Sequence, residues 1–250
     1  RTEGGESVAT SLAFGDVKRD EFYAQPVAWA VENEITYGKT TELFAPDDGV
    51  SRAEVVTFLW RVTGKPVVDR AIDFVDIKAG KYYEEAVRWA IAEGITKGVD
   101  PTHFDPDASC TRDQIVSFLY RFAKAQAVEI ENPFLDIKEK DYFYDAVVWG
   151  WNMGIVSGKS ASKFAPDDKV TRGEAVTFIY RYAKVAGGDL PNPFVDLKQG
   201  EFYYYPVLWA ANNGITSGTS VTTFSPDDNC TRAQVVSFLY RYDQQYNDAN

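Results

Sequence analysis

The chain repeats itself every 60 residues, four times over, with no insertion or deletion between the anchor positions. A fixed period of this kind indicates one supersecondary unit used four times. Because a 60-residue unit buries little apolar surface alone, we expect neighbouring repeats to share a core and to offer binding sites several times over. The anchors are Phe14, Phe74, Phe134 and Phe194; Trp29, Trp89, Trp149 and Trp209; Gly38, Gly98, Gly158 and Gly218; Pro46, Pro106, Pro166 and Pro226; and Arg52, Arg112, Arg172 and Arg232.

Composition limits the classes of partner. With 45% hydrophobic and 15% aromatic residues, 250 residues can fill a core. The net charge of −11 argues against nucleic acid and against docking on an anionic bilayer, since both need a basic face. No apolar run is long enough for a transmembrane helix, so we expect no membrane insertion. No signal peptide is recognisable, and we expect a module of a larger surface protein.

Each repeat is predicted to hold two helices joined by an irregular loop. In the second repeat, apolar spacing predicts a helix from about Tyr82 to Glu93, with Gly94 as its left-handed C-terminal residue. The turn at residues 104–107 follows, and a second helix is expected from Thr111 through Ala123. The chain is therefore predicted to be all-α.

Repeat boundaries follow the period. We expect repeats at 14–73, 74–133, 134–193 and 194–242, with polar tails at 1–13 and 243–250 that fray. The connectors between second helices and the next Phe are about a dozen residues long, so each repeat takes the same spatial step. All four repeats are expected to form one compact domain.

The second helix of every repeat begins with a capping box, in which a hydroxyl and a Glu or Gln three residues later satisfy first-turn N–H groups. The arginine between them is not explained by capping, because a cation at the first helical position opposes the helix dipole by about 0.3–1 kcal/mol. Another reason is needed for all four arginines. The boxes are Ser51 with Glu54, Thr111 with Gln114, Thr171 with Glu174, and Thr231 with Gln234.

A coarser alternation runs over the repeats. The capping acid is glutamate in the first and third repeats and glutamine in the second and fourth. Val50 and Val170 likewise alternate with Cys110 and Cys230, which indicates a small buried apolar position; a disulfide would require the two repeats to bring these sites together. The alternation suggests a duplicated pair, and we infer four units that close around one axis with pseudo-twofold character.

The ordered motifs resemble S-layer homology repeats. These are Phe-x-Asp, then Ala-Val-x-Trp-Ala, then Gly-Ile, then Phe-x-Pro-Asp, then Ser/Thr-Arg-x-Glu/Gln, close to Thr-Arg-Ala-Glu, at the start of an apolar helix, from about Phe14 to Tyr242. The resemblance implies helix-loop-helix repeats around a central helix bundle, usually three of them in a prism. It also implies binding of secondary cell-wall polymers, often with pyruvylated sugars, in grooves between repeats.

Carried over to this sequence, the resemblance assigns ligand binding to the motif arginine and to the loop around the second glycine. This chain departs from the family pattern in having four repeats, in Gln114 and Gln234, and in loops without a uniform lysine or serine, so the grooves are not expected to bind equally. The candidates are Arg52, Arg112, Arg172 and Arg232, with Tyr37, Lys39, Lys97, Ser157, Lys159, Ser217 and Thr219.

Chemistry supports the same assignment without the family. A guanidinium grips a carboxylate with two parallel hydrogen bonds, and a helix N-terminus adds free N–H donors. Together they predict a pocket for an acidic sugar substituent. The alternative is pairing between repeats with Glu54, Glu174 or the aspartate-rich turns at 47–48 and 167–168, and both roles can hold at once.

Other recurrent residues have plainer interpretations. The four period-60 tryptophans are expected in the core, with sugar stacking as the minority interpretation. Trp151 follows Trp149 by two and is the candidate exposed aromatic for ligand binding. Asp16, Asp76, Asp136 and Asp196 are expected to accept hydrogen bonds in turns.

No catalytic motif is present. His103 is the single histidine, which argues against a catalytic triad and a histidine-ligated metal, and we expect no enzyme, cofactor or metal site. We expect a non-catalytic module on the bacterial cell surface that binds an acidic secondary cell-wall polysaccharide. The alternatives are an adhesin for dietary or host glycans on the same fold, and a structural tile that assembles laterally.

Overall fold

The computed structural model describes residues 14–183 and 188–246, and these residues form eight helices without a sheet. The all-α fold predicted from the sequence is confirmed. The expected tails fall largely outside the described residues, but residues 243–246, expected to fray, continue the last helix. The helices are α1 (Ala24–Glu32), α2 (Arg52–Val62), α3 (Glu84–Ala92), α4 (Arg112–Phe122), α5 (Tyr144–Asn152), α6 (Arg172–Tyr182), α7 (Tyr204–Asn212) and α8 (Arg232–Tyr246).

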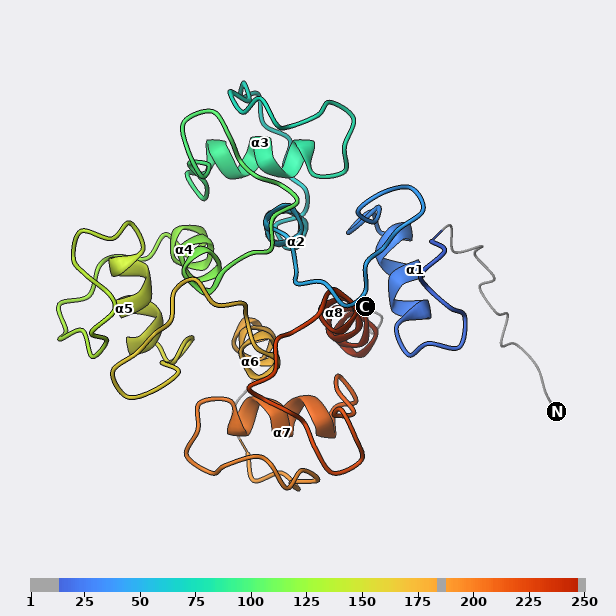
Figure 1. Ribbon diagram of the computed structural model, residues 1–250, viewed down its shortest axis with the longest axis vertical. Helices are drawn as coiled ribbons and strands as arrows, with labels where there is room; N and C mark the ends of the chain where they lie inside the picture. Colours follow the sequence, from blue (N-terminus) through green and yellow to red (C-terminus); the bar gives the residue numbers. More distant parts are fainter. Residues whose placement is uncertain (1–13, 184–187, 247–250) are drawn as a thin grey trace.

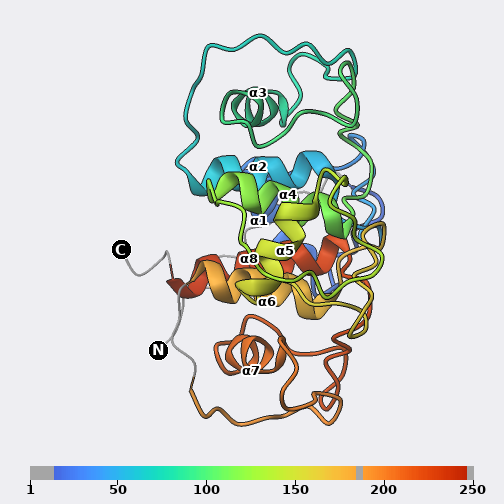
Figure 2. The same cartoon turned by 90° about the vertical axis from the view of Figure 1, so that its left-hand side faces the viewer.

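The second helices of the repeats surround a central axis, and the first helices lie outside them (Figure 1). Seen from the side, α2, α4, α6 and α8 run along this axis (Figure 2). The irregular loops that precede these inner helices gather at one end of the bundle. The N-termini of four helices therefore share one face of the molecule.

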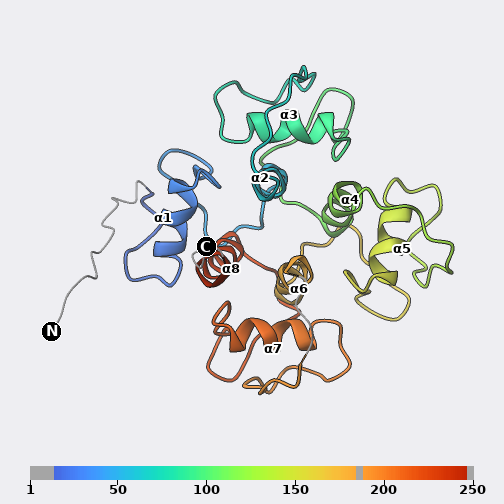
Figure 3. The ribbon, with the colours of Figure 1, turned by 180° about the vertical axis from the view of Figure 1, so that it is seen from behind.

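Helix packing takes place between repeats. Each inner helix packs against the outer helix of the next repeat, in the pairs α2 with α3, α4 with α5, and α6 with α7. The pair α8 with α1 closes the ring (Figure 3). Closure around one axis, inferred from the alternation in the sequence, is confirmed.

Backbone hydrogen bonds at the start of each inner helix join the repeats. The N–H of Arg52 donates to the carbonyl of Ala108 at 3.0 Å, and Cys110 returns a bond to Val50 at 2.8 Å. The closing junction has the same pattern, because the N–H of Arg232 donates to the carbonyl of Asp48 at 2.7 Å. The first N–H groups of a helix, which have no partner within it, thus connect one repeat to the next.

Local signals in the sequence predicted the helix ends well. All four capping boxes are present, and Gly94 adopts a φ of +71° directly after α3. The helix expected from Tyr82 begins later, at Glu84, with Tyr83 at the N-cap position. The helix α4 lies within the predicted bounds, with Thr111 as its N-cap.

The recurrent aspartates order the loop before each inner helix. The carboxylate of Asp16 accepts the N–H groups of Phe44 at 2.9 Å and Ala45 at 2.7 Å, and the other three repeats have the same pair. Ala45 has a φ of +58°, which costs a residue other than glycine about 1 kcal/mol. The paired bonds hold this strained turn, and the predicted turn-acceptor role is confirmed.

Aromatic anchors fill the core, as predicted. Trp89, Trp149 and Trp209 are buried, and Trp29 is half-buried against Tyr240. One phenylalanine in the loop before each inner helix is fully buried. These residues are Phe44, Phe104, Phe164 and Phe224.

The four inner helices leave an apolar cavity of about 170 Å³ between them, because four helices around an axis do not meet at its centre. One side chain per inner helix lines it at an equivalent position: Val55, Ile115, Ala175 and Val235. Ala175 is smaller than the branched residues at the other three positions and leaves the space that their side chains fill. A cavity of this kind costs stability in proportion to its volume.

Replacing Ala175 with isoleucine is expected to stabilise the protein. The added methylenes are buried, and about 1 kcal/mol remains after the lower helix propensity of isoleucine is subtracted. Thermal unfolding followed by circular dichroism measures the effect. Val221→Ile, at an 89% exposed position, is the control and should leave the melting temperature unchanged. A lower melting temperature for Ala175→Ile would show that this space is already filled.

The two cysteines are free and buried. Burial raises the pKa of the Cys230 thiol to about 12, and it raises the pKa of Cys110 as well. Because the thiolate is the reactive form, we expect neither thiol to react with Ellman's reagent at pH 8 in the folded protein. Both should react after unfolding in guanidinium chloride. Fast reaction of the native protein would contradict this burial.

Candidate functional site

The motif arginines join neighbouring repeats. Each lies at the first position of an inner helix, and its side chain extends into the next repeat. There Nε donates to a phenylalanine carbonyl, from Arg52 to Phe104 at 2.8 Å and from Arg232 to Phe44 at 3.0 Å. Arg112 and Arg172 bond Phe164 and Phe224 in the same way, at 3.1 Å and 2.9 Å. We call each contact region a junction and name it by its arginine.

The same phenylalanine also supports the cation. The guanidinium carbon lies 4.5–4.8 Å from the centre of the ring whose carbonyl accepts the hydrogen bond. A planar guanidinium can bond through Nε and stack on an aromatic face at once, which lysine cannot do. This double contact explains why arginine recurs at a position that the helix dipole disfavours.

All four arginines are buried, each only 3% exposed. The guanidinium groups, predicted from the sequence to form a pocket for an acidic sugar substituent, are thus covered by the protein and not open to solvent. Burial lowers the pKa of Arg52 and Arg172, and it lowers that of Arg112 to about 10. All of these groups stay protonated at neutral pH, so the junctions hold buried positive charge.

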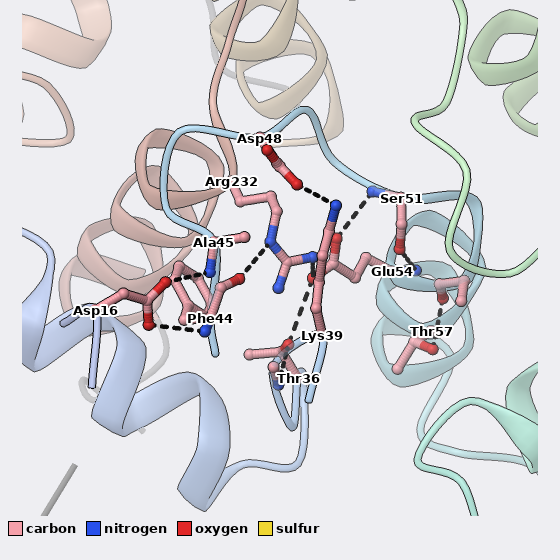
Figure 4. Close-up of polar contacts among 12 residues, drawn as sticks. Asp16, Thr36, Lys39, Phe44, Ala45, Asp48, Ser51, Glu54, Thr57 and Arg232 are labelled. Atoms are coloured by element: carbon pink, nitrogen blue, oxygen red, sulfur yellow. Dashed lines mark hydrogen bonds and ion pairs between the residues drawn. The ribbon is translucent and has the colours of Figure 1, made fainter. Parts of the chain in front are cut away.

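Two junctions supply their own counter-charge. Arg112 forms an ion pair with Glu174, and Arg232 forms one with Glu54. In each glutamate one oxygen pairs with the arginine, and the other accepts the capping N–H, of Thr171 at 2.9 Å or of Ser51 at 2.8 Å. Figure 4 shows the Arg232 junction, where Glu54 also accepts a bond from Thr36.

The other two junctions have an amide where these have an acid. Gln114 and Gln234 each use Oε1 for the capping bond, at 3.4 Å and 3.1 Å. Among the described residues, no carboxylate lies within 4.0 Å of the guanidinium nitrogens of Arg52 or Arg172. Nη2 of each is buried without a hydrogen-bond partner, as is Nη2 of Arg232. Pairing between repeats, the alternative interpretation of the arginines, thus holds at two junctions and not at the others.

The predicted loop residues lie near the junctions and play different parts. Arg112 Nη2 donates to the carbonyl of Ser157 at 2.6 Å, and the charge of Arg112 together with burial lowers the pKa of Lys159. Lys39 forms an ion pair with Asp48. The ring of Tyr37 lies 5.8 Å from that of Tyr82.

The remaining candidates have no contact with a motif arginine in the described residues. Lys97 and Ser217 are exposed, and Thr219 is exposed and bonds Ser225 at 2.8 Å. Trp151 is 39% exposed on the outer helix α5, and its ring meets Phe134 edge-on at 6.3 Å. The structure brings Arg112 together with Ser157 and Lys159, and Trp151 has no hydrogen bond or cation–π contact with a motif arginine among the described residues.

Two tyrosines beside the junctions were not among the predicted site residues. The hydroxyl of Tyr142 donates to Asp113, on the inner helix that carries Gln114. Tyr82 is close enough to Glu54 and Arg232 for both charges to affect its pKa, which burial raises well above the usual range. Both lie eight residues after the motif phenylalanine, in the second and third repeats, where the first and fourth repeats have Phe22 and Phe202, and this difference is the only signal of them in the sequence.

The sequence profile of the S-layer homology domain matches the chain at residues 13–56, 73–116, 133–176 and 193–236. The chain belongs to the S-layer homology domain family. Each match ends within an inner helix and contains its arginine and capping box. Four tandem copies, as expected from the period, are confirmed.

Several S-layer and surface proteins contain related repeats. The chain is 25% identical over 190 residues to an S-layer protein of Bacillus thuringiensis subsp. finitimus, covering 73% of this chain and 22% of that protein. It is 23% identical over 199 residues to a cellulosome-anchoring protein of Acetivibrio thermocellus, covering 75% and 42%. An amylopullulanase of Thermoanaerobacterium thermosulfurigenes is 28% identical over 180 residues, covering 70% and 10%.

The S-layer homology repeats of this chain span less than half the length of each of these relatives. The enzyme among them therefore shares only a small part of its length, and the family and the surface relatives assign this chain to cell-wall anchoring at the bacterial cell surface. No helix among residues 14–183 and 188–246 is long and apolar enough to cross a membrane.

Replacing Glu174 with alanine removes both a capping acceptor and the counter-charge of Arg112. A buried charge left without its partner costs about 3 kcal/mol or more. The matched control is Gln234→Ala, at the equivalent position, which removes the capping bond alone and costs about 1 kcal/mol. Urea unfolding measures both losses. Equal losses would contradict a stabilising ion pair at the Arg112 junction.

Proposed function

We propose that this chain anchors a larger protein to the bacterial cell wall by binding an acidic secondary wall polysaccharide, such as one with pyruvate ketals. The single observation that supports this is the pair of buried guanidinium groups, of Arg52 and Arg172, that have no carboxylate within 4.0 Å among the described residues. A buried cation without a counter-charge is costly, and an anion from outside would remove that cost.

The ligand is proposed to be an anion because of the setting of these arginines. Each lies at the N-terminus of an 11-residue helix, where the helix dipole favours negative charge. The four inner helices begin at the same face of the molecule (Figure 2), so their fields add there, even though the net charge of the chain is −11. A sugar carboxylate fits a guanidinium by two parallel hydrogen bonds.

The comparisons support the anchoring part of this proposal. The matched family and relatives named as an S-layer protein and a cellulosome-anchoring protein all concern the bacterial surface. Because the chain spans a fraction of each relative, we propose that it is the anchoring module of a longer protein and is not itself an enzyme. The wall polymer is the proposed partner.

Binding to wall material tests the proposal. The protein should sediment with bacterial sacculi that retain their secondary polymer and remain soluble with sacculi stripped of it by hydrofluoric acid. Reduction of the polymer carboxylates to alcohols is expected to weaken binding at least tenfold, because a neutral alcohol does not replace an anion at a buried cation. Unchanged binding to the reduced polymer would contradict recognition of a carboxylate.

A second candidate, an adhesin for neutral glycans, is favoured by exposed aromatic side chains. Tyr142, Tyr205 and Trp151 are 61%, 50% and 39% exposed, and aromatic faces stack on sugars. Tyr142 and Trp151 belong to the third repeat and Tyr205 to the fourth, and no ring contact joins the three among the described residues. A glycan array with neutral polysaccharide hits, and none for wall polymer, would favour this alternative.

A further inference from the structure

The third position of each inner helix divides the four junctions into two kinds. This residue faces the arginine of the preceding repeat. It is glutamate at the Arg112 and Arg232 junctions, where it forms the ion pair, and glutamine at the Arg52 and Arg172 junctions. The alternation of acid and amide in the sequence is thus an alternation of paired and unpaired buried cations.

Glutamine cannot take over the pairing role. A carboxylate has two acceptor oxygens, and Glu174 uses one for the capping N–H and the other for the guanidinium. An amide has one acceptor, which Gln234 uses on the N–H of Thr231 at 3.1 Å. Rotating the amide by half a turn would point its NH₂ at that N–H, so the capping bond fixes the orientation.

Other acids near the unpaired arginines are already engaged. Asp196 is close to Arg172, but its oxygens accept the N–H groups of Phe224 and Ser225. Asp228 acts on Arg172 only beyond ion-pair distance, as does the buried thiol of Cys230.

The surroundings of Arg52 are similar. Asp113 accepts the hydroxyls of Thr111 and Tyr142, and Asp105 and the Cys110 thiol act on Arg52 beyond ion-pair distance. Asp113 corresponds to Ala233 at the Arg172 junction, and Asp228 there corresponds to Ala108, so two acids act on each of these arginines.

The loops repeat the same division. Beside the paired junctions, Lys39 is held by Asp48, and Lys159 lies near both Arg112 and Asp168. Beside the unpaired junctions, the loop side chains Lys97, Ser217 and Thr219 are exposed, and the first two have no polar partner in the described residues. A ligand anion there meets donors on the loop as well as the arginine.

We propose that only the Arg52 and Arg172 junctions accept the carboxylate of the ligand, because Glu54 and Glu174 hold that place at the other two. The chain then binds two carboxylates on opposite sides of the ring. This inference rests on the proposed function and specifies which sites perform it.

Exchanging acid and amide tests the inference. The variant Gln114→Glu with Gln234→Glu supplies an internal carboxylate to both open junctions, and Glu54→Gln with Glu174→Gln removes it from both closed ones. Both residues occur at this position in the wild-type chain and both form the capping box, so the changes suit the fold. Isothermal titration calorimetry with a purified acidic secondary wall polysaccharide fragment measures affinity and the number of sites.

Wild-type protein is expected to bind two fragments per chain. The glutamate variant should lose binding at least tenfold, and its melting temperature should rise because Arg52 and Arg172 gain partners. The glutamine variant should bind four fragments; if it does not fold, the glutamate variant alone still decides. Of the single variants, Gln234→Glu and Gln114→Glu should each leave one site per chain.

Two results overturn the inference and leave the proposed function intact: four sites in the wild-type protein, or affinity and stoichiometry that the glutamate variant does not change. Absence of wild-type binding to the fragment overturns the proposed function itself, and this inference with it. A melting temperature that falls in the glutamate variant also contradicts the inference, since it means that no uncompensated cation was there to pair.

Discussion

The hydrogen bond from an arginine Nε to a phenylalanine carbonyl of the next repeat is the contact on which the ring depends. It occurs at every junction, with donor–acceptor distances of 2.8–3.1 Å, and at the closing junction it joins the fourth repeat to the first. The contact buries a cation at each junction, and the dielectric cost of that burial has to be offset. Stacking of the guanidinium on the phenylalanine ring offsets part of this cost at all four junctions. At two of them a glutamate offsets more of it by supplying a negative charge.

The architecture thus separates two roles that a single residue performs. As a structural element, each arginine is equivalent to the other three, because backbone atoms supply its Nε acceptor. Whether the charge of the arginine is paired depends on one side chain, which is glutamate or glutamine. Either residue caps the inner helix. An acid can therefore be exchanged for an amide at this position without loss of the helix, which lets the same fold hold paired and unpaired cations.

Much of the fold could be predicted from the sequence because its signals are local. The capping boxes, Gly94 and the apolar spacing fixed the helix ends to within about two residues, and exact periodicity indicated equal junctions. The turn role of Asp16 and its equivalents was predictable for the same reason. The axial cavity was not, because it depends on how closely four helices approach an axis and not on any one repeat.

The candidate site was harder to predict because its contacts are distant in sequence. Arg52 bonds a residue 52 positions away, and Arg232 bonds one 188 positions away. The acid-amide alternation was visible in the sequence, but its meaning required knowing that this side chain faces the preceding arginine. Burial of the guanidinium groups could not be predicted from the sequence either, because a charged residue at the start of a helix is usually exposed to solvent.

Closure also determines how many repeats one ring can hold. An open array of repeats leaves an apolar face at each end and needs polar terminal units to cover them. Here the helix pair α8 with α1 covers both faces at once, so no such terminal unit is required. Since four junctions complete the circle, a fifth copy could enter this ring only if the angles at the junctions changed.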